Sequence, residues 1–138
     1  MNPPIRSWLG LRIWIVGASS GIGAALAKEL ARQGAELILS ARRLAPMQAL
    51  GIEQANLVAL DVCDQAQWLK ASEQVLAGDK VDLIIWMAGI YRPVSSTNYR
   101  LNDVLAMTQT NYLSLLYALD QLLPYFLNRS KLKPKPVS

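Results

Sequence analysis

Short runs of large apolar residues alternate along this chain with longer amphipathic stretches. The first run covers residues 12–16, where four apolar residues stand in succession before Gly17. Similar runs follow at 36–40, 56–60 and 81–87. Strands that are apolar on both faces are typical of a parallel sheet with helices on both sides. We therefore predict four buried parallel strands over these ranges.

The interval after the first strand has a helical pattern. Ile22, Leu26 and Leu30 recur every four residues, and Gly34 follows where glycine commonly ends a helix. The pattern predicts a glycine-rich turn and then a helix within residues 20–34.

Three further helices are predicted, over residues 44–50, 64–77 and 101–127. Asp64 is a suitable N-cap for the second of these. Pro124 is expected to end or kink the last, because proline lacks the backbone N–H that a helix interior needs. The apolar stripe of that long helix consists of Leu101, Val104, Leu105, Thr108, Tyr112, Leu115, Leu116, Leu119, Leu122 and Leu123.

Strands and helices in alternation predict right-handed crossovers between parallel strands. The expected fold class is α/β, a Rossmann-type doubly wound parallel sheet truncated after about four strands and the long helix. Residues 1–128 are predicted to form this one domain. Residues 129–138, which are basic and contain proline, are predicted to be a disordered tail.

Charge and hydropathy narrow the possible partners. The net charge of +4 equals the four basic residues within 129–138, so the rest of the chain is neutral, and no nucleic-acid partner is expected. No apolar run reaches the roughly 20 residues that span a bilayer, and no secretory signal is evident. We therefore expect a cytoplasmic protein without a membrane partner.

The chain contains no histidine and a single cysteine, Cys63. Histidine bases, an internal disulfide and a zinc site are therefore excluded, and no metal site is predicted. Chemistry at this protein must rely on another kind of group or on a cofactor.

Gly17, Gly21 and Gly23 fall between the first strand and its helix. Glycines there allow a sharp turn, the approach of a pyrophosphate to bare backbone, and close packing of helix on strand. Free N–H groups at the helix start then face the phosphates. The arrangement predicts a dinucleotide site.

The end of the second strand indicates which dinucleotide. An NAD-binding domain usually has an acidic residue there for the ribose 2′-hydroxyl, whereas this chain has Arg42 and Arg43. A guanidinium group can hold the 2′-phosphate of NADP through two parallel hydrogen bonds. NADP(H) is therefore the expected cofactor in preference to NAD(H), although an exposed arginine pair is an alternative explanation.

In these features the chain resembles the short-chain dehydrogenase/reductase family from Arg12 to about Leu127. The three glycines match the family motif Thr-Gly-x-x-x-Gly-x-Gly, with Val16 at the threonine position. The resemblance assigns further residues to the cofactor site: Ser19, Ser20, Ile22, Asp61, Val62, Ala88 and Gly89. It assigns Asn111 to the helix asparagine that the family counts with its catalytic residues. Trp86 and Met87 stand where the family usually has asparagines.

The family transfers hydride between a nicotinamide and a carbonyl or alcohol, using a serine, a tyrosine and a lysine four residues after the tyrosine. No Tyr-x-x-x-Lys occurs in this chain. The resemblance thus implies the cofactor half of an NADP(H)-dependent oxidoreductase, with a small substrate only if the other half is supplied.

Three functional alternatives remain open from the sequence: the cofactor half of an enzyme, a non-catalytic NADP(H)-binding module, and a decayed remnant. A Rossmann methyltransferase is disfavoured by the glycine spacing and the arginine pair. The apolar fourth strand would form a sheet edge, and the long helix would keep part of its stripe uncovered. Self-association is therefore expected.

Overall fold

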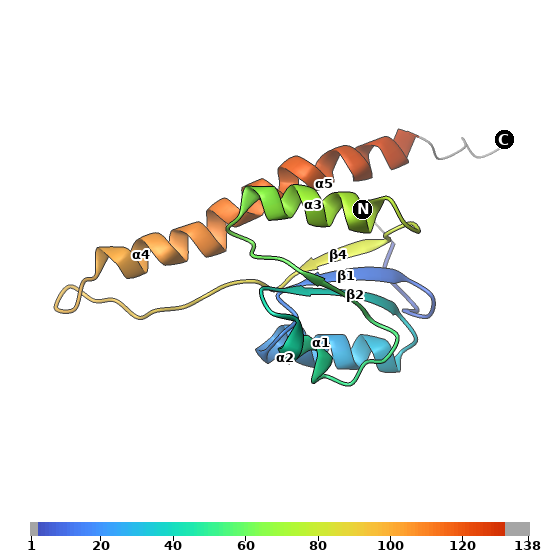
Figure 1. Ribbon diagram of the computed structural model, residues 1–138, viewed down its shortest axis with the longest axis horizontal. Helices are drawn as coiled ribbons and strands as arrows, with labels where there is room; N and C mark the ends of the chain where they lie inside the picture. The colour runs from blue at the N-terminus through green and yellow to red at the C-terminus, as the bar shows by residue number, and fades with distance from the viewer. Residues whose placement is uncertain (1–2, 132–138) are drawn as a thin grey trace.

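The computed structural model describes residues 3–131 and contains one four-stranded parallel sheet (Figure 1). The strands are β1 (Arg12–Val16), β2 (Glu36–Ala41), β3 (Asn56–Ala59) and β4 (Leu83–Trp86). The helices are α1 (Gly21–Arg32), α2 (Leu44–Gln48), α3 (Gln65–Leu76), α4 (Leu101–Thr108), the π-helical turn η1 (Gln109–Leu113) and α5 (Ser114–Lys131). The predicted Rossmann-type α/β class is confirmed.

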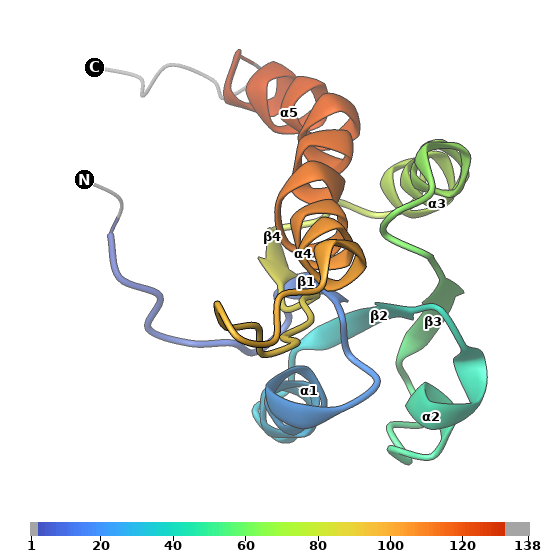
Figure 2. The same cartoon turned by 90° about the vertical axis from the view of Figure 1, so that its left-hand side faces the viewer.

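The strand order is β3-β2-β1-β4, with every neighbouring pair parallel. The chain therefore moves outward from β1 to β3 and then crosses back to place β4 on the other side of β1. Helices α1 and α2 cover one face of the sheet, and α3 and α5 cover the other (Figure 2). The point between β1 and β4, where the direction reverses, is where open α/β sheets bind ligands.

Strand β1 is buried on both faces, as its continuous apolar sequence predicts. Ile13 and Ile15 pack into the core beside α1, whereas Trp14 and Val16 pack into the core beneath α3 and α5. All four side chains are fully buried. Since successive residues of a strand point to opposite faces, this one strand anchors both helical layers.

Two predicted helix ends agree with the structure, whereas one residue of the predicted apolar pattern of α1 is exposed. The Asp64 carboxylate accepts a hydrogen bond from the Gln67 backbone N–H at 3.1 Å, which confirms the N-cap of α3. Gly34, at φ +82°, follows the end of α1. Ile22 does not join the core, because it lies in the first turn of α1 with 74% of its surface exposed.

The long helical stretch runs without a break from Leu101 to Lys131 and passes through Pro124. Pro124 was expected to end or kink the helix, and the structure shows that the helix does not end there. The last turn is held at the sheet, where Arg129 donates to the Val81 carbonyl and stacks 5.4 Å from the Tyr125 ring centre. Residues 129–131 of the predicted tail are helical, and residues 132–138 lie outside the described part.

The buried face of α5 shares only Leu122 with the apolar stripe predicted from the sequence. Its buried residues are Ser114, Ala118 and Leu122, spaced by four. Ala118 and Leu122 pack in the core that also contains Trp68 and Val75 of α3. Most of the predicted stripe is instead exposed, namely Leu101, Leu105, Tyr112, Leu116, Leu119 and Leu123.

Strand β4 pairs only with β1 among the described elements, so it forms an edge of the sheet as predicted. Its four side chains are all half-buried, in contrast to the fully buried β1. Within residues 3–131, no helix combines the length and the apolar character that a membrane crossing requires.

Candidate functional site

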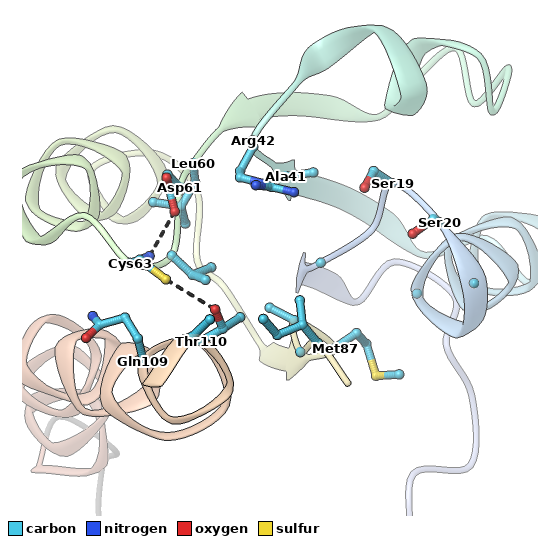
Figure 3. A pocket seen from close by; sticks show the side chains of 18 of the residues that line it. Ser19, Ser20, Ala41, Arg42, Leu60, Asp61, Cys63, Met87, Gln109 and Thr110 are labelled. Atoms are coloured by element: carbon cyan, nitrogen blue, oxygen red, sulfur yellow. Dashed lines mark hydrogen bonds between the residues drawn. The ribbon is translucent and has the colours of Figure 1, made fainter. Parts of the chain in front are cut away.

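A cavity of about 650 Å³ opens at the carboxyl ends of all four strands (Figure 3). Its walls come mainly from the segments that directly follow each strand, with η1 closing one side. The lining residues that the sequence predicted are Gly17, Ser19, Ser20, Gly21, Ile22, Gly23, Arg42, Asp61, Val62, Ala88 and Gly89. Residues predicted from four separate segments, one after each strand, are thus brought together around one cavity.

The turn after β1 is fixed between its two neighbouring strands. The backbone N–H groups of Gly17 and Ala18 both donate to the Ser40 carbonyl at the end of β2, at 2.8 and 3.1 Å. Gly17 has φ +93°, and a β-carbon there would lie 2.5 Å from the Ala88 nitrogen. No side chain fits between the turn and the segment that follows β4.

The other two glycines meet different requirements. A β-carbon on Gly23 would lie 2.1 Å from the Gly17 carbonyl oxygen, so this glycine lets α1 pack directly on the turn. A β-carbon on Gly21, at φ +55°, would contact nothing within 4 Å. Gly21 therefore leaves bare backbone facing the open cavity, which is what close approach by a phosphate needs.

The start of α1 provides hydrogen-bond donors to the cavity. The first N–H groups of an α-helix have no acceptor within the helix, and the Ser20 side chain makes no capping bond. Ser19 and Ser20 lie beside these groups on the cavity wall (Figure 3). Unpaired donors combined with the positive end of the helix dipole favour an anion at this position.

Only one of the two arginines after β2 lines the cavity. Arg42 lines the cavity and lies between Asp61 and Ser19 (Figure 3). Arg43 is the N-cap residue of α2, has extended backbone, and is not among the lining residues. Of the two predicted arginines, the structure thus places Arg42 and not Arg43 on the cavity wall.

The wall after β3 is built around Asp61. Its carboxylate accepts from the Cys63 backbone N–H at 3.0 Å, and its own N–H donates to the Gln67 side chain at 2.7 Å. The Cys63 sulfur lies 3.5 Å from the Thr110 hydroxyl oxygen, which joins this wall to η1. Asp61 thus shapes a turn in addition to lining the cavity.

Asn111 does not line the cavity but holds a segment that does. Its side-chain oxygen accepts from the Ile90 N–H, and its side-chain nitrogen donates to the Ile90 carbonyl, both at 2.8 Å. The wider π-helical turn of η1 carries Asn111 together with the lining residues Gln109 and Thr110. Such turns inside α-helices occur frequently at functional sites.

The end of β4 has an indole and a thioether where the resembling family usually has amides. Trp86 donates through its indole nitrogen to the Ala88 carbonyl at 2.9 Å. Met87 lines the cavity. The backbone of Ala88 and Gly89 consequently still forms a wall, although neither asparagine is present.

Sequence reasoning did not identify nine lining residues: Ala41, Leu60, Cys63, Met87, Ile90, Arg92, Ala106, Gln109 and Thr110. Most of them directly adjoin a predicted site residue, so their proximity along the chain was an available signal. Ala106, Gln109 and Thr110 depend on how the long helix passes over the cavity, and no local pattern reveals that.

The cavity carries more positive than negative charge among its lining residues. Arg42 and Arg92 are its cations and Asp61 is its acid, with Arg92 also paired to Asp103 at 3.1 Å. Across residues 3–131, no cluster of three or more Asp, Glu, Cys or His side chains is arranged to hold a metal ion. The arrangement can bind an extended anionic ligand through backbone N–H groups and a guanidinium group.

A parallel sheet in this order, with an anion-binding cavity at its switch point, defines a Rossmann-type dinucleotide-binding fold. The sequence model of the short chain dehydrogenase family matches residues 12–132, which is most of the chain. The chain therefore belongs to the short-chain dehydrogenase family.

Individual relatives agree with this membership. The chain is 34% identical over 117 residues to an uncharacterized oxidoreductase of Staphylococcus haemolyticus, covering 81% of this chain and 51% of the relative. It is 35% identical over 124 residues to a fatty acyl-CoA reductase of Acinetobacter baylyi, covering 83% and 42%. The chain spans about half the length of the curated relatives it matches.

Among solved structures, an NADPH-bound carbonyl reductase from chicken fatty liver is similar to this fold. Its TM-score is 0.77 at 26% sequence identity, over 92% of this chain and 52% of that protein. The serine dehydrogenase of Escherichia coli gives a TM-score of 0.73 at 25% identity, over 86% of this chain and 57% of that protein.

Proposed function

We propose that this chain forms the NADP(H)-binding half of a short-chain dehydrogenase/reductase. The observation that carries the proposal is the cavity at the switch point, where the open backbone at Gly21, the donor groups of α1 and the Arg42 side chain face one space. A dinucleotide presents a pyrophosphate and, in NADP, an additional 2′-phosphate. The cavity offers a separate donor set for each.

Arg42 is proposed to select NADP(H) over NAD(H). It lies at the end of β2, where an acidic residue would accept from an unmodified ribose 2′-hydroxyl. A guanidinium group is positively charged and binds a phosphate through charge-assisted hydrogen bonds. The NADPH-bound carbonyl reductase of similar fold supports this preference.

The proposed reaction of the whole protein is hydride transfer between the nicotinamide and a carbonyl or alcohol carbon. When bound, the cofactor supplies or accepts the hydride. The residues of this chain bind and orient it, and Asn111 is proposed to act as a positioning residue through its hold on Ile90. The family's Tyr-x-x-x-Lys does not occur in the 138 residues, so proton transfer to the substrate oxygen requires groups outside this chain.

Because this chain lacks that motif, a non-catalytic NADP(H)-binding module is the second candidate. Both candidates require that the chain binds the nucleotide. They differ in whether the whole protein catalyses a reaction. The chain alone should bind NADPH and catalyse no carbonyl reduction. Measurable reduction of a carbonyl by the pure chain would contradict the assignment of proton transfer to groups outside it.

Cys63 provides a direct test of the proposed site, since it is the only cysteine of the chain and lines the cavity. Saturating NADPH should slow alkylation of Cys63 by iodoacetamide, and NADPH should have no effect on the urea-unfolded chain. Equal alkylation rates with and without NADPH, at concentrations that saturate any binding, would place the nucleotide elsewhere or exclude it.

A further inference from the structure

Two tryptophans stack on one another between helix α3 and strand β4. Trp68 of α3 and Trp86 of β4 have ring centroids 5.7 Å apart and planes inclined by only 14°. Trp68 is fully buried and Trp86 is half-buried, so the stack is shielded on the Trp68 side. Offset stacking of this kind contributes beyond simple burial and fixes how the two rings lie.

Each of these indoles also bonds to a different wall of the cavity. The Trp68 indole nitrogen donates to the Val62 carbonyl at 2.9 Å, on the wall after β3. The Trp86 indole nitrogen donates to the Ala88 carbonyl at 2.9 Å, on the wall after β4. Both carbonyls belong to residues that line the cavity. One rigid aromatic pair therefore connects two walls that no direct pairing between β3 and β4 could connect, since β2 and β1 lie between them.

A third tryptophan extends this arrangement into the centre of the sheet. The Trp14 ring on β1 lies 5.9 Å from the Trp68 ring, and its indole nitrogen donates to the Ser40 hydroxyl at 2.8 Å. The Ser40 carbonyl is the acceptor for the glycine turn. The three indole N–H groups thus donate to residues at or near the carboxyl ends of strands β2, β3 and β4.

We infer that Trp68 and Trp86 are positioning residues that set the spacing between the Val62 wall and the Ala88 wall of the nucleotide cavity. This inference rests on the proposed function. Under it, Asp61 and Val62 lie toward the adenosine half of NADP(H), and Ala88 and Gly89 lie toward the nicotinamide half.

If Trp86 has this role, its substitution should change the affinity for the whole dinucleotide and the affinity for its adenosine fragment by different amounts. Trp86→Phe keeps an aromatic ring beside Trp68 but removes the indole donor to Ala88 together with the second ring of the indole. Affinity for NADPH should fall by about tenfold, the effect of one lost hydrogen bond at the wall, while affinity for 2′,5′-ADP stays within about twofold. A residue that merely stabilises the fold would lower the unfolding midpoint and leave both affinities of the folded chain unchanged.

Trp8→Phe is the matched control, because Trp8 is half-buried in the opposite core, beside α1. It should leave both affinities unchanged. Trp86→Leu, which removes both the stack and the donor, should weaken NADPH binding more than Trp86→Phe does. Because Trp68 is fully buried, its substitution would also destabilise the fold, so the test relies on the two Trp86 variants.

The decisive measurement is calorimetric titration of the full chain and these variants with NADPH and with 2′,5′-ADP. Selective loss of NADPH affinity in Trp86→Phe supports the inference. Unchanged NADPH affinity, or an equal loss for both ligands, overturns it while leaving the proposed function intact. Absence of NADPH binding by the unaltered chain overturns the inference and the proposed function together.

Discussion

The β-carbon position of Gly17 lies 2.5 Å from the backbone nitrogen of Ala88, although 71 residues separate them in the sequence. The glycine turn after β1 and the segment after β4 therefore pack backbone against backbone. This contact makes glycine necessary at position 17 whether or not a nucleotide is bound. The requirement at Gly21 differs, because the space beside it is open.

Gly17→Ala should destabilise the chain by about 3 kcal/mol or more, since alanine adds both positive-φ strain and a backbone clash. Gly51→Ala is the matched control. Gly51 has φ +68°, and its added β-carbon would meet nothing within 4 Å, so strain alone should cost about 1 kcal/mol. Urea unfolding measures both values. Equal losses in the two variants would contradict the close packing of Gly17 on Ala88.

Arg42→Ala should weaken NADPH binding by about 10- to 100-fold and leave NADH binding unchanged, because the charge-assisted bonds to the 2′-phosphate are lost. Arg43→Ala removes the same charge from the neighbouring residue, which does not line the cavity. It should change NADPH affinity by less than about threefold at physiological salt. A comparable loss in both variants, measured by fluorescence titration, would mean that Arg43 also reaches the phosphate.

Asn111→Leu should release the segment after β4, since both bonds to the Ile90 backbone are lost. Hydrogen exchange at the Ile90 amide should accelerate about tenfold, corresponding to the roughly 1 to 2 kcal/mol that two such bonds contribute at a partly exposed site. Asn102→Leu, on an exposed position of α4, is the control. Unchanged exchange at Ile90 in Asn111→Leu would show that the segment is held by other contacts.

The exposed stripe on α4, η1 and α5, together with the apolar edge at β4, predicts that the chain associates with a second copy of itself. Leu116→Lys combined with Leu123→Lys should shift the chain toward monomer in sedimentation velocity. Leu9→Lys combined with Leu44→Lys adds the same charge at two exposed leucines outside this stripe and should leave the distribution unchanged. A monomeric unaltered chain at high concentration would contradict self-association.

Much of the fold is readable from the sequence because its signals are local. The apolar run at β1, the N-cap at Asp64 and the helix end at Gly34 each depend on residues within a few positions. At their carboxyl ends β3 and β4 are each one residue shorter than the predicted ranges 56–60 and 81–87, since pairing stops where the segments turn into the cavity walls. Strand β4 also begins two residues later than predicted.

The long helix shows where local reasoning fails. Several of its leucines are exposed, whereas the small residues Ser114 and Ala118 are fully buried. Pro124 is accommodated within the helix, whose end is held by the contacts of Tyr125 and Arg129 with Val81. These contacts join residues more than 40 positions apart, so no local pattern could reveal them.

The residues that line the cavity can be predicted from the sequence at the strand ends, but less so on the helix. The glycine turn, Arg42 and Asp61 all follow strands of a parallel sheet, whose carboxyl ends meet at one edge by geometry alone. Gln109 and Thr110 reach the cavity through the π-helical turn, which has no sequence signature here. Arg43 was also predicted but does not line the cavity.

The most direct test of the central claim is the ratio of the dissociation constants of the unaltered chain for NADH and NADPH, measured by titration at one salt concentration. The proposed NADP(H) site predicts that NADPH binds at least about tenfold more tightly, because Arg42 meets a phosphate in one ligand and a hydroxyl in the other. Equal affinity, tighter binding of NADH, or no binding of either nucleotide would contradict it.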